Sequence, residues 1–218
     1  MQASLSDNDW APELKGAMLL ANVIPLAHAV AVLYSLFHWH WLVSLAVLYL
    51  LPPFSVSSLF SVRGRPKGRY PVSSPEFLTW WLSCQAQTLF LRLPFLEELL
   101  RLVPGLYSAW LRLWGSRLGA RTYWSPGTVV LDRSYLELGD DVVFGAGARL
   151  NGHVVARDAA GRLELIVDDI SIGEGASVGG YSLLTAGTFV AAGETLRACL
   201  LSPPYSRWEG GRRVKEPA

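Results

Sequence analysis

The sequence lacks charge over a long stretch near its start. No Asp, Glu, Lys or Arg occurs from residue 16 to residue 62, although 17% of the chain is charged. About 20 apolar residues suffice to cross a bilayer, and residues 17–37 reach that length. Residues 42–60 follow an aromatic bend, and Pro52 and Pro53 should kink or end their helix. We expect a transmembrane helical hairpin over residues 16–62, either fully crossing or re-entrant.

Basic residues appear as soon as the apolar stretch ends. Arg63, Arg65, Lys67 and Arg69 place the following chain in the cytoplasm by the positive-inside rule. Two crossings would return the chain to its starting side, so residues 1–15 are expected to be a cytoplasmic segment. These first residues also lack the basic start of a signal peptide. The expected location is therefore the cytoplasmic membrane, as a multi-pass protein.

Other signatures are scarce as well. The two cysteines, Cys84 and Cys199, lie far apart and form no CxxC pair, which argues against a disulfide framework and fits a reducing compartment. A net charge of +1 gives no global sign of nucleic-acid binding. The run 63–66 also looks like a minor-groove arm, but beside an apolar hairpin we interpret it as membrane-flanking charge. There is no Walker A loop and no G-x-S-x-G elbow.

Residues 63–117 are expected to form a basic segment followed by short amphipathic helices. Pro75 and Pro94 suit first turns, and Pro104 followed by Gly105 breaks the pattern. Their Trp- and Leu-rich faces with basic edges suit a bilayer interface. They would equally suit a cap over the open end of a β-structure, which needs its edges covered.

Residues 118–201 show apolar residues at every sixth position. A helix would repeat every 3.6 residues and a strand every 2, so neither explains this period. A three-sided parallel β-helix does, with one short strand on each face and glycine turning the corner. We assign residues 118–218 to that domain. The repeating positions are Leu138-Gly139, Phe144-Gly145, Leu150, Ile172-Gly173, Val178-Gly179, Leu184, Val190 and Leu196.

The break between the two sets of repeats resembles a known family. The first set ends in Leu150-Asn151-Gly152-His153, a polar loop covers residues 156–162, and repeats resume at Ile172 with Val178-Gly179-Gly180. This pattern resembles the left-handed β-helix, hexapeptide-repeat acyltransferases. The tail Trp208-Glu209-Gly210 looks like the hexapeptide domain that ends poly-amino-acid synthetases. The resemblance implies a homotrimer with active sites between neighbouring subunits. By the positive-inside rule, these active sites would face the cytoplasm.

The same resemblance implies transfer of an acyl group, most simply acetyl from acetyl-CoA or another acyl-CoA, to a hydroxyl or amine. His153 stands where the family has its catalytic histidine, and a neutral imidazole can accept the acceptor's proton near pH 7. Asp132, Glu137 and Asp158 are candidates to orient its ring. Gly179 or Gly180 could donate a backbone N–H to the developing oxyanion.

Further site residues follow from the resemblance. The donor's pantetheine would lie along Thr185, Ala186 and Gly187, and its phosphates would meet Arg212 and Arg213. Asn151 and Arg157 are the acceptor-binding candidates. The family's usual asparagine in the coil before the histidine falls here near Gly127-Thr128, and its usual Asn-Pro-Ala near the end is Gly211-Arg212-Arg213. These departures put acceptor identity and CoA contacts in question more than the fold.

A zinc enzyme and a non-catalytic scaffold are the alternatives to an acyltransferase. The related γ-type carbonic anhydrases need three zinc-binding histidines on their coils, and His153 is the only histidine outside residues 16–62, so we expect no metal. His38 and His40, interleaved with tryptophans, suit an interfacial belt. A catalytically silent trimeric scaffold at the membrane remains the alternative to an enzyme. For an enzyme, anchoring suggests a lipid bilayer partner and a membrane-associated acceptor: a lipid-linked saccharide, an envelope precursor or a nascent peptide.

Overall fold

The computed structural model describes residues 12–214 and divides into two compact units. The helical unit contains the described residues up to Leu89 together with Val155–Ile166. The β-helix unit contains Phe90–Val154 and the described residues from Val167 onward. These units divide the chain at residues 89–90 and around the segment 155–166, and the expected domain limits stay a prediction. Most of the expected N-terminal segment (residues 1–11), like residues 215–218, lies outside the described residues.

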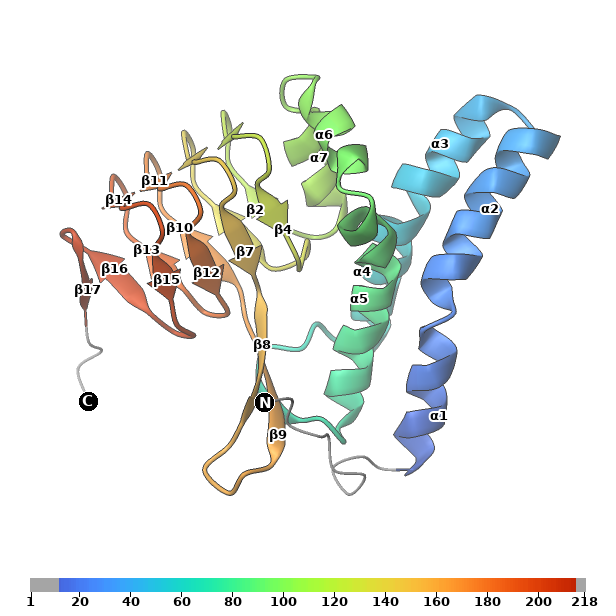
Figure 1. Ribbon diagram of the computed structural model, residues 1–218, viewed down its shortest axis with the longest axis horizontal. Coiled ribbons are helices and arrows are strands. Elements are labelled where there is room, and N and C mark those ends of the chain that lie inside the picture. Colours follow the sequence, from blue (N-terminus) through green and yellow to red (C-terminus); the bar gives the residue numbers. More distant parts are fainter. Residues whose placement is uncertain (1–11, 215–218) are drawn as a thin grey trace. The chain divides into compact units, whose positions relative to one another are not determined.

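The expected hairpin is present as helices. Stretches of 24 and 23 residues, Lys15–His38 and Trp41–Arg63, are long and apolar enough to cross a membrane by length and composition alone. His40 caps the second stretch, because its Nδ1 accepts the Leu42 backbone N–H at 3.2 Å. The individual helices (Figure 1) are α1 (Pro12–Ala21), α2 (Ile24–His38), α3 (Trp41–Tyr49) and α4 (Leu51–Arg63), which has Pro52 and Pro53 in its first turn.

On α2 and α3, large apolar side chains are exposed and small polar ones are buried, the reverse of the usual arrangement in a water-soluble protein. Leu26 and Phe37 are 65% and 78% exposed, whereas Ser35 and Ser44 are buried. Both serine hydroxyls donate to the Val32 carbonyl at 2.9 Å, and the bond from Ser44 joins α3 to α2. Small polar residues that bond between helices, with large apolar residues facing outward, are typical of helices packed in lipid.

A small sheet completes the helical unit. Its strands are ordered β1-β9-β8, with β1 at Gly68–Pro71, β8 at His153–Arg157 and β9 at Leu163–Val167. The sequence predicted only a polar external loop at residues 156–162, but the chain forms a β-hairpin there (Figure 1). Helix α5 (Pro75–Arg92) follows β1, and the Phe77 N–H bonds Ser74 Oγ at 3.1 Å as its cap.

The predicted parallel β-helix is confirmed by three parallel sheets and a repeating register. The first sheet contains β2, β5, β10, β13 and β16, the second β3, β6, β11 and β14, and the third β4, β7, β12 and β15. All eight repeating aliphatic or aromatic residues are buried. Their left-handed winding stays a prediction from the resemblance. The strands of the first two coils are β2 (Arg117–Leu118), β3 (Tyr123–Trp124), β4 (Val129–Val130), β5 (Leu136–Leu138), β6 (Val143–Phe144) and β7 (Arg149–Asn151).

The chain leaves the stack as β8 and β9 and then adds two more coils (Figure 1). The tail that resembles a closing segment forms an antiparallel hairpin of β16 and β17. The remaining strands are β10 (Ile170–Ile172), β11 (Ser177–Val178), β12 (Leu183–Thr185), β13 (Phe189–Val190), β14 (Thr195–Leu196), β15 (Leu201–Ser202), β16 (Arg207–Glu209) and β17 (Arg212–Val214).

The repeating glycines serve a different purpose from the one predicted. A Cβ on Gly139 would lie 2.5 Å from the backbone nitrogen of Glu174, in the next coil. Glycine therefore stands there because neighbouring coils approach too closely for a side chain. The positive φ angles of this corner fall two residues later, at Asp141 (56°) and at Gly175 (68°).

Helices α6 (Phe95–Arg101) and α7 (Leu106–Leu113) cover the first coil. Trp124 Nε1 donates to Ser108 Oγ at 2.9 Å, and the Tyr107 ring meets the Trp124 ring edge-on. Glu97 is buried and accepts the Tyr107 hydroxyl at 2.6 Å and Arg133 Nε at 2.9 Å. Of the two roles left open for these helices, the cap is therefore formed, while a membrane-interface role stays a prediction.

Candidate active site

His153 lies where the second coil ends and the chain departs from the stack. The preceding Gly152 passes close to the first coil, because a Cβ there would lie 2.9 Å from Tyr135 Cβ and 3.0 Å from Asp132 Cβ. Only glycine allows this approach without displacement. The close passage carries His153 to the corner between the third and first sheets, where Asp132 also lies.

His153 and Asp132 form a hydrogen-bonded pair. The distance from His153 Nδ1 to Asp132 Oδ2 is 2.6 Å. The Asp132 side chain is fully buried, and 22% of the His153 side chain is exposed. A carboxylate at Nδ1 holds the proton of a neutral ring on that nitrogen, so the lone pair of such a ring is on Nε2. The pair thus has the arrangement of a base with an orienting carboxylate.

Two opposing effects set the basicity of this histidine. Burial on its own lowers the pKa of His153, while the charge of Asp132 and its hydrogen bond raise it. The net pKa lies above the ordinary value of 6.5. The site therefore holds a proton more strongly than a free imidazole does.

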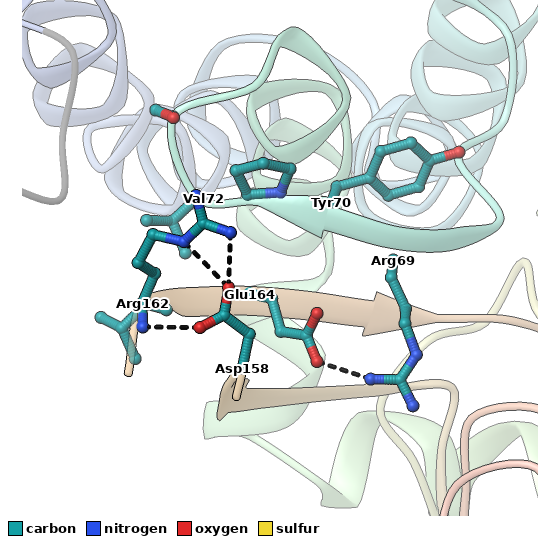
Figure 2. A pocket seen from close by; sticks show the side chains of 9 residues that line it. Arg69, Tyr70, Val72, Asp158, Arg162 and Glu164 are labelled. Atoms are coloured by element: carbon teal, nitrogen blue, oxygen red, sulfur yellow. Dashed lines mark hydrogen bonds and ion pairs between the residues drawn. The ribbon is translucent and has the colours of Figure 1, made fainter. Parts of the chain in front are cut away.

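The other two candidate carboxylates bond elsewhere. Glu137 pairs with Arg117 and lies 3.4 Å from Ser171 Oγ. Asp158 accepts the backbone N–H of Arg162 at 2.8 Å and its Nε at 2.9 Å within the β8–β9 hairpin, as Figure 2 shows. These bonds, the backbone bond first, hold the pKa of Asp158 below its ordinary value. Asp132 is thus the candidate that contacts His153.

The two acceptor-binding candidates differ in their surroundings. Asn151 ends β7, and its Oδ1 is buried without a hydrogen-bond partner among residues 12–214. A buried acceptor of this kind is costly unless a ligand or water satisfies it. Arg157 is exposed and donates to the Gly161 carbonyl at 2.6 Å, within its own hairpin.

The two oxyanion candidates lie at another corner. Gly179 and Gly180 connect β11 to β12, between the second and third sheets. The Gly179 N–H already donates to the Leu196 carbonyl at 2.9 Å, which leaves Gly180 as the better candidate. In a single β-helix, these glycines and His153 thus stand at different corners.

The residues expected to bind the donor share the corner of His153. Thr185 and Ala186 are buried, and the Thr185 hydroxyl donates to the Ser202 carbonyl at 2.7 Å, so neither side chain faces outward. Gly187 has φ +70° and lies under the ring of Tyr205, a residue that the sequence pattern did not single out. The side chains of Thr185 and Ala186 are therefore not available to a ligand at this corner, where Tyr205 is exposed. Exposed guanidinium groups that suit phosphates stand on β17, at Arg212 and Arg213.

The described chain shows no grouping of residues for a metal. Among residues 12–214, no three His, Cys, Asp or Glu side chains gather closely enough to hold an ion. At this corner, the His153–Asp132 pair can transfer a proton.

No protein-family model and no curated protein match the chain significantly. Its structural neighbours include hexapeptide-repeat acetyltransferases. One from Vibrio cholerae, solved with acetyl coenzyme A, is 22% identical with a TM-score of 0.36; the match covers 45% of this chain and 58% of that protein's length. A maltose O-acetyltransferase from Clostridium difficile is 17% identical, with a TM-score of 0.29, over 56% of this chain and 82% of its own. A galactoside acetyltransferase solved with coenzyme A is 13% identical, with a TM-score of 0.33, over 58% and 79%.

Proposed function

We propose that this protein is a membrane-anchored acyltransferase that moves an acyl group from acyl-CoA to a hydroxyl or amine of a membrane-associated acceptor. The observation that supports this most is the 2.6 Å bond between His153 Nδ1 and the buried Asp132. A buried carboxylate that orients a partly exposed imidazole is the arrangement of a general base. The sequence resemblance to acyltransferases around residues 150–180 is the reason that we propose acyl transfer as the reaction of the His153–Asp132 pair.

The reaction assigns a role to each group of the site. When bound, CoA would supply the acyl thioester. His153 Nε2 takes the acceptor's proton while the acceptor oxygen or nitrogen bonds the acyl carbon and the carbon–sulfur bond breaks. The imidazolium, stabilised by Asp132, then returns the proton to the leaving sulfur. The Gly180 N–H stabilises the negative charge that develops on the carbonyl oxygen.

A homotrimer would complete such a site. Gly180 and His153 stand at different corners of one β-helix, so a second copy is needed to bring the two groups to one substrate. Closed cyclic assemblies of this kind are common among soluble oligomers. The proposal therefore places each active site between neighbouring subunits.

A bilayer is the proposed partner of the helical unit. The outward apolar residues of α2 and α3 would contact lipid, and Arg63 to Arg69 would lie on the cytoplasmic side. The catalytic domain then works on the cytoplasmic face, on an acceptor held at the membrane.

Acyl transfer by the detergent-purified protein tests this function. Release of CoA from acetyl-CoA would be followed with a panel of envelope-type acceptors, for the wild type and for His153→Ala. We expect the variant to lose about 10²- to 10⁴-fold in rate while it remains a trimer, although its Tm should fall because the buried Asp132 loses His153 as a partner. His40→Ala, in the helix bend, is the matched control and should keep full activity.

The opposite outcome would favour a different function. Calorimetry would show no binding of CoA, and no acceptor would be modified, if the β-helix were a silent scaffold. Before that conclusion, the same assay would be repeated with an acyl carrier protein as donor. Turnover that is unaffected by His153→Ala would remove the proposed role of the histidine.

A further inference from the structure

The helical unit contains two clefts along the same pair of helices. The apolar cleft has a volume of about 270 Å³ and lies between α2, α4 and α5. Its lining consists of aliphatic residues together with His28 and Ser55, and the small side chains of Ala27, Ala31, Ser55 and Ala86 leave the space open. A cleft of this composition accepts a hydrocarbon chain and disfavours charged groups.

The cationic cleft lies at the other end of α4 and has a volume of about 490 Å³. Arg63 and Arg65 line it, and Glu76 is the one carboxylate that the structure describes in its lining. The Arg63 side chain is exposed and has no ion-pair partner among residues 12–214. The guanidinium of arginine suits phosphate because it offers several donors in a fixed plane.

A neighbouring cleft in the same unit shows what a neutralised arginine site looks like. In Figure 2, Arg69 bonds Glu164 at 2.5 Å and Arg162 bonds Asp158 at 2.9 Å, so both guanidinium groups are compensated. In the cationic cleft, by contrast, Arg63 forms no ion pair with the described residues. It is therefore the better of the two for an anion.

The two clefts are placed for one amphiphilic molecule. Ser55 lines the apolar cleft and Arg63 the cationic one, and both belong to α4. Eight residues of helix correspond to about 12 Å along its axis. On α5, Ala86 lines the apolar cleft while Glu76 and Thr79 line the cationic one, so both helices run from one cleft to the other. Arg63 also ends a stretch long enough to cross a membrane, which puts the cationic cleft at its edge.

We propose that this helix pair binds a phosphate-bearing lipid, with the phosphate at Arg63 and Arg65 and the hydrocarbon chain in the apolar cleft. If the proposed acyltransferase function holds, this lipid site also names the acceptor class. The acceptor is then a lipid phosphate, or a saccharide or precursor carried on a lipid phosphate. The lipid site itself requires no catalytic activity, so the two proposals can fail separately.

Basic residues beside an apolar helix also fix membrane orientation, and this simpler role must be separated from binding. Lys67 offers the matched control, because it carries the same charge in the same cluster but does not line the cationic cleft. If the cluster only fixes membrane orientation, Arg63 and Lys67 should contribute equally. If the cleft binds phosphate, Arg63 should matter more than Lys67.

The test is lipid binding to the detergent-purified, full-length protein. Fluorescent phosphatidic acid would be titrated and then displaced by unlabelled phosphatidic acid, phosphatidylcholine or inorganic phosphate. We expect Arg63→Gln to weaken binding by about tenfold or more, and Lys67→Gln to leave it unchanged. Displacement by phosphatidic acid, but not by inorganic phosphate, would support a lipid source of the phosphate.

The apolar cleft has its own variant and control. Ser55→Phe fills the cleft and should also weaken binding about tenfold, whereas Ser58→Phe, exposed on the same helix outside the lining, should not. Equal losses in Arg63→Gln and Lys67→Gln, or in both phenylalanine variants, would overturn the proposal in favour of diffuse surface attraction. Binding by His153→Ala should equal that of the wild type. Intact binding without any turnover would then count against the acyltransferase alone.

Discussion

Leucine behaves oppositely in the two units. Leu150 and Leu184 in the β-helix unit are fully buried, while Leu26 and Leu33 on α2 are 65% and 53% exposed. In the coils, a period of six directs each aliphatic side chain inward. On α2 and α3, apolar residues occur on all sides, and serines take the inward positions. Apolar content alone therefore does not locate a core, and the helical unit exposes a large apolar surface, as the proposed contact with lipid requires.

The two units also differ in where their charged side chains lie. The hairpin contains no charged side chain from residue 16 to residue 62, whereas the β-helix unit buries Arg133 completely beside Glu97. Glu97→Ala should leave this arginine buried without its partner, at a cost of about 3–5 kcal/mol in free energy of unfolding. Chemical denaturation of the detergent-purified protein would measure it.

Glu98→Ala is the control for this prediction. The Glu98 side chain is 41% exposed and bonds Arg101 at 2.5 Å. Arg101 is itself buried but keeps its bonds to Glu97 and to the Thr128 carbonyl, so the loss of Glu98 should cost about 1 kcal/mol. Similar losses in both variants would show that the cap does not depend on the buried ion pair.

Truncating leucine in each unit tests the first comparison directly. Leu184→Ala opens a cavity in the β-helix core and should cost about 2–5 kcal/mol, because the coils cannot collapse around it. Leu33→Ala should leave the Tm in detergent nearly unchanged, since its side chain already faces outward. A large loss at Leu33 would indicate that α2 packs against protein on that face.

The coils could be predicted from the sequence because their buried positions follow a short repeat along the chain. Each buried position recurs six residues later, so Leu138, Phe144 and Leu150 could be placed before any contact was known. Strand β1 was missed, because residues 68–71 pair with residues far away in the chain and carry no repeat. Asp132 could not be chosen over Glu137 for a similar reason: the choice depends on how closely Gly152 passes the preceding coil.

The His153–Asp132 pair makes pH a further test, with a smaller effect. Asp132→Asn removes the charge that raises the pKa of His153 and leaves burial, which lowers it. We therefore expect NMR titration of the ring to show a lower pKa in Asp132→Asn than in the wild type. An unchanged pKa would mean that the two side chains do not interact in solution.

Stability and activity should respond to pH in opposite directions. The pKa of His153 in the folded protein lies above its unfolded value of about 6.5. The stabilisation from the charged pair is then complete below the unfolded pKa and is lost as pH rises through the folded pKa. A general base must be neutral, so turnover should rise over the same interval. Turnover that falls there would indicate that the imidazolium, not the base, is the active form.

The smallest effect is expected at a corner of the first two coils. Arg121 forms two bonds to Asp141, at 2.6 and 2.7 Å, and both side chains are largely exposed. Water screens such a pair and competes for both partners, so Arg121→Ala should leave the Tm of the protein unchanged. Both residues have positive φ angles, 54° and 56°, which the stacked backbone imposes whatever the side chain. If the variant lost as much stability as Glu97→Ala, the ion pair rather than the backbone ladder would be holding these corners in place.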